Sequence, residues 1–488
     1  MPSFDKRPLL VLGATGYVGK RLIPHLLDAG YRVRVVARSL AKLKASSWRD
    51  HPLIEFAACD VLDPPLLKEA CNGCSAVYYL VHSMSPGQKD FAKTDRQAAA
   101  NLLKTAEETG LERIIYLAGL GEEGKDLSKH LRSRREVEKI LKEGKTPVTI
   151  LRAAMIIGAG SASFEILRYL VDRLPMMITP RWVSTESQPV AIRNVLYYLT
   201  ECLKVPETIG QTLDIGGNEI LTYRKLMEIY AEEAKLRKRF VIPVPVLTPR
   251  LSSYWIHLVT PIHASIARPL AEGLRNKVIV KDARILELIP QRLMTAREAI
   301  RLALDEKQYY LSESDEEKSF RPCEWSYPDD PPWAGGLVFE EKRSMTLDAP
   351  PAQIWKPVSQ IGGETGWYYA NWLWRLRGAI DKILGGVGMR KGRPAGTSLK
   401  CGDKIDFWRV EKVIPEKELL LIAEMKLPGL ALLHFCIKQK ENGKTELKQT
   451  ARFIPRGLAG IFYWYLMFPF HQLIFNGMIR GIGNHVKK

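Results

Sequence analysis

The sequence contains few cysteines, and they are not spaced as a disulfide framework. There are seven among 488 residues, an odd number that suits a reducing compartment better than a secreted scaffold. Cys71 and Cys74 have the separation of a redox motif, but no second pair is present that would complete a zinc site. We therefore predict a protein without structural disulfides and without a metal site.

Acidic residues are too few to balance the basic ones. The chain has 54 Asp and Glu against 72 Lys and Arg, which gives a net charge of +18. Such an excess favours anionic partners, which include phosphorylated cofactors, acidic lipid head groups and nucleic acid. The basic residues are spread along the whole chain and do not alternate with aromatic residues as in nucleic-acid-binding modules. We therefore expect no nucleic-acid partner.

The first residues lack the apolar run of a secretory signal. Residues 1–8 carry Asp5, Lys6 and Arg7 and lead directly into the apolar run 9–12. Together with the cysteine content, this start predicts a cytoplasmic protein.

Over residues 9–160 the sequence alternates short apolar runs with longer amphipathic segments. The runs predict strands at 9–12, 32–37, 54–57, 76–81, 113–117 and 148–151, and the amphipathic segments predict helices at 20–29, 65–71, 90–109 and 131–142. This order is typical of an α/β fold in which helices cover both faces of a parallel sheet. The sequence therefore predicts a doubly wound Rossmann sheet.

From about residue 161 to residue 303 the pattern becomes mainly helical, and we expect this region over the edge of the sheet where substrates bind. Within it, residues 251–267 contain no charged side chain and one proline. They are rather short for a membrane span, so we interpret them as a buried or lid-like pair of short helices. An apolar segment in this place favours a hydrophobic substrate.

A polar segment and then the proline-rich residues 320–336 mark a domain boundary. After it we predict a strand at 337–347, helices at 351–360 and 366–384, several strands within 399–455, and a long apolar helix from about residue 457. This order describes an α+β helix-grip fold, in which a curved sheet holds a long helix beside a cavity. The predicted parts are a Rossmann domain over 1–305, a linker over 306–334 and a helix-grip domain over 335–488.

The turn after the first predicted strand carries three glycines at regular spacing. Gly13 permits the tight turn, Gly16 lets the backbone approach a pyrophosphate, and Gly19 lets the next helix pack closely on the strand. The N-terminus of that helix then points at the phosphates. The sequence therefore predicts a dinucleotide site, and the turn residues expected in it are Gly13, Thr15, Gly16, Tyr17, Val18 and Gly19.

The cofactor preference depends on the end of the second predicted strand. NAD-binding domains place an acidic residue there to bind the ribose hydroxyls, and residues 32–39 contain none. Arg38 stands at this position, where a guanidinium can pair with the 2'-phosphate of NADP. We therefore predict NADP(H) as the cofactor, with NAD(H) as the less favoured alternative.

Three motifs in the first part of the chain resemble those of one family. Residues 13–19 (GATGYVG), 59–63 (CDVLD) and 151–161 (LRAAMIIGAGS) are similar to the atypical or extended short-chain dehydrogenase/reductase superfamily, in its NmrA-like branch. The resemblance covers roughly the first 300 residues. It implies that Asp60 and the backbone of Val61 contact the adenine.

The last part of the chain resembles a different superfamily. Residues 337–488 are similar to polyketide-cyclase/START-like helix-grip proteins, and residues 366–378 and 385–393 look like an uncharacterised family that is often fused to such reductases. This second resemblance implies a START-like ligand-binding fold more than it implies an activity.

The residues that catalyse reduction in classical members of the reductase superfamily are missing. Those members use a serine and a Tyr-x-x-x-Lys pair, whose lysine lowers the pKa of the tyrosine. This chain has Ala118 and Gly119 where the serine belongs, and His130 and Arg134 where the tyrosine and lysine belong. The standard proton relay is therefore absent.

Two histidines are alternative proton donors, because imidazole titrates near neutral pH. His130 would be the acid, with Arg134 as its electrostatic neighbour. His82, together with Ser83, competes for this role because it follows the fourth predicted strand and would face the nicotinamide. A third interpretation gives both histidines a structural role as caps of a loop or a helix.

The apolar run near the C-terminus has three interpretations. Residues 457–479 contain no Asp, Glu, Lys or Arg and are long enough to cross a bilayer. Pro469 and His471 interrupt the run, so we favour a helix packed into the helix-grip fold over a span. Tyr463, Trp464 and flanking basic residues also suit an interfacial helix in peripheral contact with the inner face of a membrane.

These features together predict an NADP(H)-binding oxidoreductase that acts on a hydrophobic small molecule. Its substrate would be quinone-, lipid- or isoprenoid-like and would be held with the help of the C-terminal domain, where Trp367, Trp372 and Trp374 favour an apolar ligand. The missing Ser-Tyr-Lys set supports a second hypothesis, a non-catalytic NADP(H)-dependent sensor or scaffold. A third hypothesis is a lipid carrier at the membrane surface.

Overall fold

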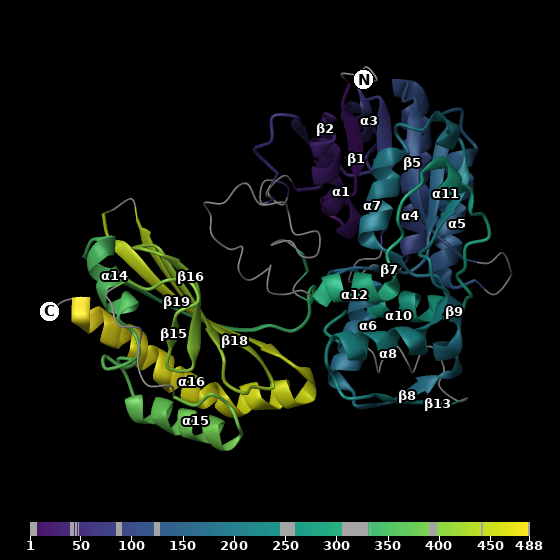
Figure 1. Cartoon of the computed structure of the whole chain (residues 1–488). Coiled ribbons are helices and arrows are strands. Elements are labelled where there is room, and N and C mark those ends of the chain that lie inside the picture. The colour runs from purple at the N-terminus through teal and green to yellow at the C-terminus, as the bar shows by residue number, and fades with distance from the viewer. Residues whose placement is uncertain are drawn as a thin grey trace. The chain divides into compact units, whose positions relative to one another are not determined.

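The computed structural model describes residues 7–39, 43, 46, 48–83, 90–121, 127–244, 259–304, 330–331, 333–389, 398–440 and 443–486. They form two compact units, residues 1–336 and residues 337–488 (Figure 1). Each unit has its own sheet and its own buried apolar cluster.

The first unit is built on a sheet of seven parallel strands in the order β11-β6-β5-β4-β1-β2-β3. Their bounds are β1 Leu9–Leu12, β2 Val33–Ala37, β3 Ile54–Ala58, β4 Ala76–Tyr79, β5 Arg113–Gly119, β6 Val148–Ala153 and β11 Thr212–Ile215. The strand order reverses between β1 and β4, which is where such sheets open a ligand crevice. The predicted Rossmann sheet is therefore confirmed, with one strand, β11, that the sequence did not predict.

Both faces of this sheet are buried, as the alternation along β1 shows. Leu9 and Val11 belong to the cluster that includes helix α1, whereas Leu10 and Leu12 belong to the cluster on the opposite face. The covering helices are α1 Tyr17–Asp28 and α7 Ile192–Glu201 on one face, and α3 Pro64–Cys71, α4 Phe91–Thr109 and α5 Lys129–Lys142 on the other. All-parallel sheets need this double cover.

Polar residues set the starts of the helices on the second face. Asp63 accepts the backbone N–H of Leu66 at the start of α3, and Ser128 accepts that of Leu131 at the start of α5. Both side chains satisfy an amide that has no acceptor within its helix. The Ser128 cap fixes the start of α5 and so the position of His130 in its first turn.

The region after β6 combines helices with short strands. Its helices are α6 Ala162–Arg173, α8 Tyr223–Glu233, α10 Ala264–Gly273, α11 Arg284–Leu288 and α12 Ala296–Leu304, with 3-10 turns at Arg181–Ser184 and Pro206–Thr208. Three two-stranded sheets pair β7 Ile156–Ile157 with β10 Val190–Ala191, β9 Glu186–Ser187 with β12 Leu221–Thr222, and β8 Met176–Pro180 with β13 Phe240–Val244. Of the predicted lid 251–267, residues 251–258 lie outside the described residues.

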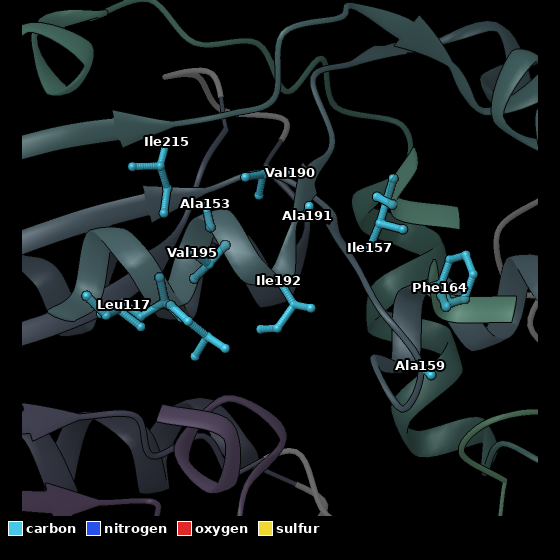
Figure 2. Close-up of a cluster of buried hydrophobic side chains, with 14 of the residues drawn as sticks. Leu117, Ala153, Ile157, Ala159, Phe164, Val190, Ala191, Ile192, Val195 and Ile215 are labelled. Carbon is cyan, nitrogen blue, oxygen red and sulfur yellow. The ribbon is translucent and has the colours of Figure 1, made fainter. Parts of the chain in front are cut away.

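This region shares one apolar core with the sheet. Figure 2 shows Leu117 of β5 and Ala153 of β6 in the same cluster as Ile192 of α7 and Phe164 of α6. Leu117 is 9% exposed and the other three side chains are at most 7% exposed. The region is therefore packed into the first unit and is not a separate domain.

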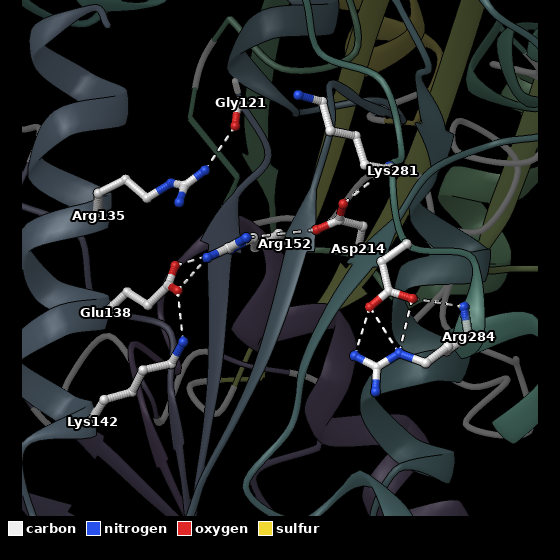
Figure 3. A network of polar contacts seen from close by, with 9 residues as sticks. Gly121, Arg135, Glu138, Lys142, Arg152, Asp214, Lys281 and Arg284 are labelled. Carbon is white, nitrogen blue, oxygen red and sulfur yellow. Dashed lines mark hydrogen bonds and ion pairs between the residues drawn. The ribbon is translucent and has the colours of Figure 1, made fainter. Parts of the chain in front are cut away.

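A polar network joins the far edge of the sheet to α5 (Figure 3). Glu138 of α5 accepts hydrogen bonds from Arg152 of β6 and from Lys142, and Arg152 also lies 4.0 Å from Asp214 of β11. Burial raises the pKa of Glu138, but the two basic partners lower it below its ordinary value. The network holds α5 against β6 and so fixes one wall of the site described below.

The end of the first unit returns to its beginning. The carboxylate of Asp330, 4% exposed, accepts hydrogen bonds of 2.6 and 3.3 Å from the fully buried Arg21 of α1. Gly335 donates its backbone N–H to Glu165 of α6, and the carbonyl of Trp333 accepts from Tyr169. We call residues 330–336 the closing segment; the rest of the predicted linker 306–334 lies outside the described residues.

The second unit is an antiparallel sheet of six strands in the order β14-β19-β18-β17-β16-β15, with a long C-terminal helix. The strands are β14 Phe339–Leu347, β15 Lys404–Ile405, β16 Trp408–Ile414, β17 Glu418–Ala423, β18 Gly429–Gln439 and β19 Thr445–Pro455. The helices are α14 Pro351–Ser359, α15 Asn371–Ile383 and α16 Gly457–Val486. This α+β arrangement confirms the predicted order of elements.

The sequence predicted a helix from residue 366, but helix α15 begins at Asn371. Tyr368 and Ala370 have φ values of 63° and 49°, which a right-handed helix does not tolerate. The side chain of Asn371 accepts the backbone N–H of Trp367 and closes this turn. The apolar spacing that suggested an earlier start comes from side chains of the turn that are buried in the core, chiefly Trp367.

Helix α16 is buried along only part of its length. Met478, Ile479 and Ile482 in its second half are at most 4% exposed and pack in the core of the second unit. In its first half Phe462 is 71% exposed and Tyr465 is 64% exposed. Within the described residues α16 is the one helix long and apolar enough to cross a membrane by length and composition, and 22% of its most apolar window is buried.

Candidate functional site

The glycine turn has the geometry that the sequence predicts. Gly13 has a φ of +92°, and its carbonyl accepts the backbone N–H of Gly16 at 2.9 Å. A Cβ atom on Gly19 would lie 2.3 Å from the carbonyl oxygen of Gly13, so this position has no room for any side chain. Turn and helix therefore touch backbone to backbone.

The turn leaves the start of α1 open toward solvent. Gly16 is the N-cap of α1 and carries no side chain to satisfy the first amides of the helix, while Thr15 beside it is exposed. The first amides of a helix have no acceptor within it and bind anions well, because the helix dipole adds to their partial charge. Tyr17 and Val18 in this first turn would therefore offer backbone N–H groups to a phosphate.

The other residues predicted for the cofactor follow the neighbouring strands at the same edge of the sheet. Arg38 comes directly after β2 and is exposed, and Asp60 follows β3. The carboxylate of Asp60 accepts the backbone N–H of Leu62, and the carbonyl of Val61 accepts from Asn101 of α4. Because β1, β2 and β3 are adjacent and parallel, all the predicted cofactor residues lie along one edge.

The two histidines that competed as proton donors lie side by side. Nε2 of His82 lies 3.2 Å from Nδ1 of His130, and Nδ1 of His82 lies 2.9 Å from a carboxylate oxygen of Asp95. His82 follows β4, His130 is in the first turn of α5, and Asp95 is in the second turn of α4. The structure therefore joins the two alternatives into one hydrogen-bonded series.

Asp95 is the member of this series that the sequence analysis missed. Its carboxylate also accepts the backbone N–H of Ser83 at 2.9 Å and the hydroxyl of Ser133 at 3.3 Å. It is 3% exposed and stands on the buried stripe of α4, three residues before Ala98 and seven before Leu102. A charged residue in the apolar stripe of a predicted helix was the signal that could have identified it.

The pKa values of all three residues in the series are lowered. Burial raises the pKa of Asp95, but its hydrogen bonds from His82 and Ser83 outweigh burial and lower it to about 2. Burial and the nearby charge of Arg134 lower the pKa of His82 to about 4. Burial and the neighbouring His82 lower the pKa of His130 well below its ordinary value. At neutral pH the series therefore holds one carboxylate and two neutral imidazoles.

These protonation states fix the directions of the hydrogen bonds. An ionised Asp95 can only accept, so His82 donates from Nδ1 and keeps a lone pair on Nε2. His130 must then donate from Nδ1 to that lone pair, which leaves its own Nε2 as the proton-accepting nitrogen. His130 Nε2 is thus the end of the series that can exchange a proton with a bound molecule.

Arg134 supplies a permanent positive charge beside the histidines. Its Nη1 donates to the carbonyl of Val81 and to the hydroxyl of Tyr116, both at 3.4 Å. Both contacts are long, so the guanidinium keeps donor capacity for another oxygen. Arg134 and His130 therefore both lie on α5. They stand at the positions that the lysine and the tyrosine hold in classical members of the reductase superfamily.

The site is next to the glycine turn. A Cβ atom on Gly13 would lie 2.8 Å from the carbonyl carbon of Leu80, so the turn touches the chain two residues before His82. Leu80 also donates its backbone N–H to Leu12. The histidine series and the expected phosphate site therefore share the edge of β1 and β4.

Cys71 and Cys74, the pair with the spacing of a redox motif, have unreactive thiols. Burial raises the pKa of Cys71 to about 12 and that of Cys74 to about 11, so both thiols are protonated and unreactive at neutral pH. Across the part of the chain that the structure describes, no group of three His, Cys, Asp or Glu residues could hold a metal ion.

Two families match separate parts of the chain. Residues 13–168 match a family described as NAD(P)H-binding, and residues 333–478 match a family described as a protein of unknown function, DUF2867. The first match confirms the NAD(P)H-binding part of the prediction. The START-like resemblance of the second unit stays a prediction.

Curated relatives are distant and only partly covered. The chain is 22% identical over 271 residues to the chloroplastic divinyl chlorophyllide a 8-vinyl-reductase of Arabidopsis thaliana. It is 24% identical over 252 residues to the mitochondrial NADH dehydrogenase [ubiquinone] 1 alpha subcomplex subunit 9 of Mus musculus. Each alignment includes 50% of this chain, and the chain spans 63% and 65% of the length of these two relatives.

Among solved structures, the triphenylmethane reductase of Citrobacter sp. in complex with NADP(H) aligns with a TM-score of 0.50 and 20% identity. The alignment covers 61% of this chain and 100% of the reductase. This likeness shows a shared fold. The first unit is thus a Rossmann domain that binds NAD(P)H.

Proposed function

We propose that the protein is an NADP(H)-dependent oxidoreductase that reduces a hydrophobic carbonyl or quinone-like molecule at the edge of β1 and β4. The observation that carries this proposal is the hydrogen-bonded series Asp95–His82–His130, which ends beside the glycine turn. The reductase among the curated relatives supports the reaction class. The second unit, as a START-like domain, would help to hold the substrate.

Each residue has a separate task in this reaction. The cofactor, when bound, supplies the hydride; the turn from Gly13 to Gly19 holds its phosphates. The Arg134 guanidinium stabilises the negative charge that develops on a carbonyl oxygen as hydride arrives. In the fraction of molecules in which solvent has protonated Nε2 of His130, that nitrogen gives the proton to the oxygen, and His82 with Asp95 keeps the imidazole in the required orientation.

Hydride transfer to a substrate panel is the direct test. Purified protein should oxidise NADPH in the presence of at least one quinone, enone or lipid carbonyl, as followed by the loss of nicotinamide absorbance. Binding of NADPH without turnover across the whole panel would instead support the non-catalytic sensor, the second hypothesis. That alternative has a specific basis, because the lowered pKa values leave only a small fraction of either histidine protonated at neutral pH.

Arg38 should decide the preference between the two dinucleotides. Replacing Arg38 with Ala removes a charged hydrogen bond to the 2'-phosphate, so NADPH should bind about tenfold more weakly while NADH binding stays within about twofold. Fluorescence titrations with both cofactors measure the two dissociation constants. Arg32, an exposed arginine at the opposite end of the same strand, is the matched control, and Arg32→Ala should change neither constant. Equal losses for NADPH and NADH in Arg38→Ala would contradict a role in phosphate recognition.

A further inference from the structure

The second unit contains an apolar cavity of about 390 Å³. It lies between α15, α16, the strands β16, β18 and β19 and residues 425–428, and most of its lining is aliphatic or aromatic. Its lining includes Leu373 and Trp374 of α15, Trp408 of β16, Leu432 of β18, Phe453 of β19 and Ile474 of α16. A volume of this size lies within the range of small-molecule sites.

Two of the tryptophans in the wall carry polar hydrogens without acceptors. Nε1 of Trp374 and Nε1 of Trp408 are buried and have no hydrogen-bond partner among the described residues. Trp367 stacks on Trp374 with ring centroids 4.6 Å apart, but its own Nε1 donates to Asp406 at 2.8 Å. Both unpaired nitrogen atoms are less than 1 Å² accessible, so these N–H groups lie behind the cavity surface, and the wall that a ligand would meet is mostly apolar.

The mouth of the cavity is formed by exposed apolar side chains of the two helices. Leu376 and Ile380 of α15 and Leu384 at its C-cap line the cavity and are between 44% and 57% exposed. Phe470 of α16 lines it from the other helix and is 46% exposed. The route into the cavity therefore passes between α15 and α16.

These mouth residues belong to two longer stripes of exposed apolar residues. On α15 the stripe repeats at four-residue spacing from Trp372, and on α16 it runs along the first half of the helix. We call the two stripes together the apolar face. Its members are Trp372, Leu376, Ile380 and Ile383 on α15 with Leu384 at its C-cap, and Leu458, Phe462, Tyr465, Leu466, Phe470 and Leu473 on α16. Exposed apolar residues in this number on two helices that line the same cavity indicate an interaction site.

The exposed charges on the two helices are of one sign. Helix α16 contains no acidic residue, and Asp381, the one acid on α15, is buried and accepts the backbone N–H groups of Gly388 and Lys426. The exposed charged residues are Arg375 and Lys382 on α15 and Arg480 on α16, and Lys426 and Arg456 outside the helices are exposed as well. Basic residues around aromatic and aliphatic side chains match an anionic lipid surface.

We propose that the apolar face docks onto an anionic bilayer surface and that the cavity takes a lipid-like molecule with an apolar body directly from that bilayer. The cavity mouth lies within the face that would meet the lipids, so the ligand would leave the acyl region without crossing water. This inference extends the hydrophobic-ligand part of the proposed function. It concerns binding alone and holds or fails without hydride transfer.

Sedimentation with lipid vesicles tests the docking. At about 0.15 M salt, where surface charges are screened beyond about 8 Å, the full chain should sediment with vesicles of phosphatidylcholine that contain about one-third phosphatidylglycerol. With phosphatidylcholine alone it should bind at least about tenfold more weakly, because the basic residues then find no anionic partner. Ile383→Glu and Phe462→Glu should each lower binding to the anionic vesicles about tenfold, because each places a carboxylate in the apolar face.

Phe240 provides the matched control, since it is 64% exposed but belongs to β13 of the first unit. Phe240→Glu should sediment like the unchanged protein. A full chain that stays in the supernatant with anionic vesicles would overturn the docking proposal, as would Ile383→Glu and Phe462→Glu variants that bind as well as the unchanged protein.

Uptake of a fluorescent fatty acid tests the cavity separately. cis-Parinaric acid, whose emission rises in an apolar environment, should pass from anionic vesicles to the full chain in the absence of NADPH. Ala431→Trp, which fills the cavity from β18, should abolish uptake and leave docking unchanged. Ile383→Glu should slow uptake from vesicles at least about tenfold, yet leave affinity for dispersed fatty acid unchanged, because Ile383 does not line the cavity. Uptake by Ala431→Trp at the unchanged rate would exclude this cavity as the site.

Discussion

A single methyl group at position 19 is expected to abolish cofactor binding. The Cβ atom of Gly19→Ala would lie 2.3 Å from the Gly13 carbonyl oxygen and 3.0 Å from Cα of Ala14, and both neighbours are backbone atoms that cannot rotate away. The turn must then move away from α1, which separates the phosphate-binding amides. We expect the dissociation constant for NADPH to rise at least about 100-fold and the free energy of unfolding to fall by about 1–3 kcal/mol.

Gly16→Ala is the companion variant that separates these two effects. Its Cβ atom would lie 3.1 Å from the Gly13 carbonyl oxygen, a tight contact that a small shift relieves, and Gly16 has an ordinary φ of –80°. The unliganded variant should unfold at nearly the same temperature as the unchanged protein but lose most of its affinity for NADPH, because the methyl group occupies the approach of the pyrophosphate. Fluorescence titration and thermal unfolding with and without NADPH measure both quantities. Full NADPH affinity in Gly19→Ala would show that the dinucleotide binds elsewhere.

Loss of the imidazole at position 130 is expected to lower kcat about 100-fold, the usual contribution of a positioned general acid. His130→Phe keeps an aromatic ring in the same place but removes Nε2, the proton-exchanging end of the series. The dissociation constant for NADPH should stay within about twofold, since the ring is not part of the phosphate site. Single-turnover reduction of the best substrate from the panel measures the chemical step directly.

The pH dependence of the same reaction gives an independent readout. Because the pKa of His82 is lowered to about 4 and that of His130 lies well below its ordinary value, the protonated fraction of the pair rises as pH falls. Reduction needs that proton, so kcat should increase by up to about tenfold for each pH unit from pH 8 down to pH 5. His130→Phe should lose this dependence, while Ser133→Ala, which removes only a 3.3 Å contact to Asp95, should keep it. A pH-independent kcat in the unchanged protein would exclude the pair as the proton source.

The part of the fold that the sequence predicts best is the part with the strongest periodicity. In β1 and β4 every residue is buried, so short uninterrupted apolar runs identify these strands. Strand β11 was not recognised because its four residues include Asp214 and so form no uninterrupted apolar run within a mainly helical region. The glycine turn was predictable because each glycine is needed for a local property of the backbone: the tight turn, the approach of the pyrophosphate or the close packing of the helix.

The histidine series could be predicted only in parts. Sequence position identified His82 and His130 separately, because each follows a strand end or stands at a known offset in a helix. Their contact depends on how α5 packs beside α4 and the chain after β4, and no local pattern reports that packing. The alternatives therefore stayed open until Asp95, from a third element, was seen to hold His82 in place.

The exposure of the first half of α16 could not be predicted from its composition. A helix that is apolar on all sides has no stripe from which a buried face could be predicted. The sequence analysis favoured a packed helix, and the structure packs Met478 and Ile482 but leaves Phe462 in solvent. Which half is covered depends on where the six-stranded sheet ends, a property of the whole second unit.

The closing segment has a consequence for how the chain matures during synthesis. The buried guanidinium of Arg21 meets the carboxylate of Asp330 only after more than 300 further residues have been added to the growing chain. Until then a buried charge in α1 and the carboxylate of Glu165 lack partners that the finished unit supplies, which costs stability. The nascent first unit should therefore remain accessible to chaperones until residue 336 has emerged, and a fragment that stops near residue 305 should fold poorly.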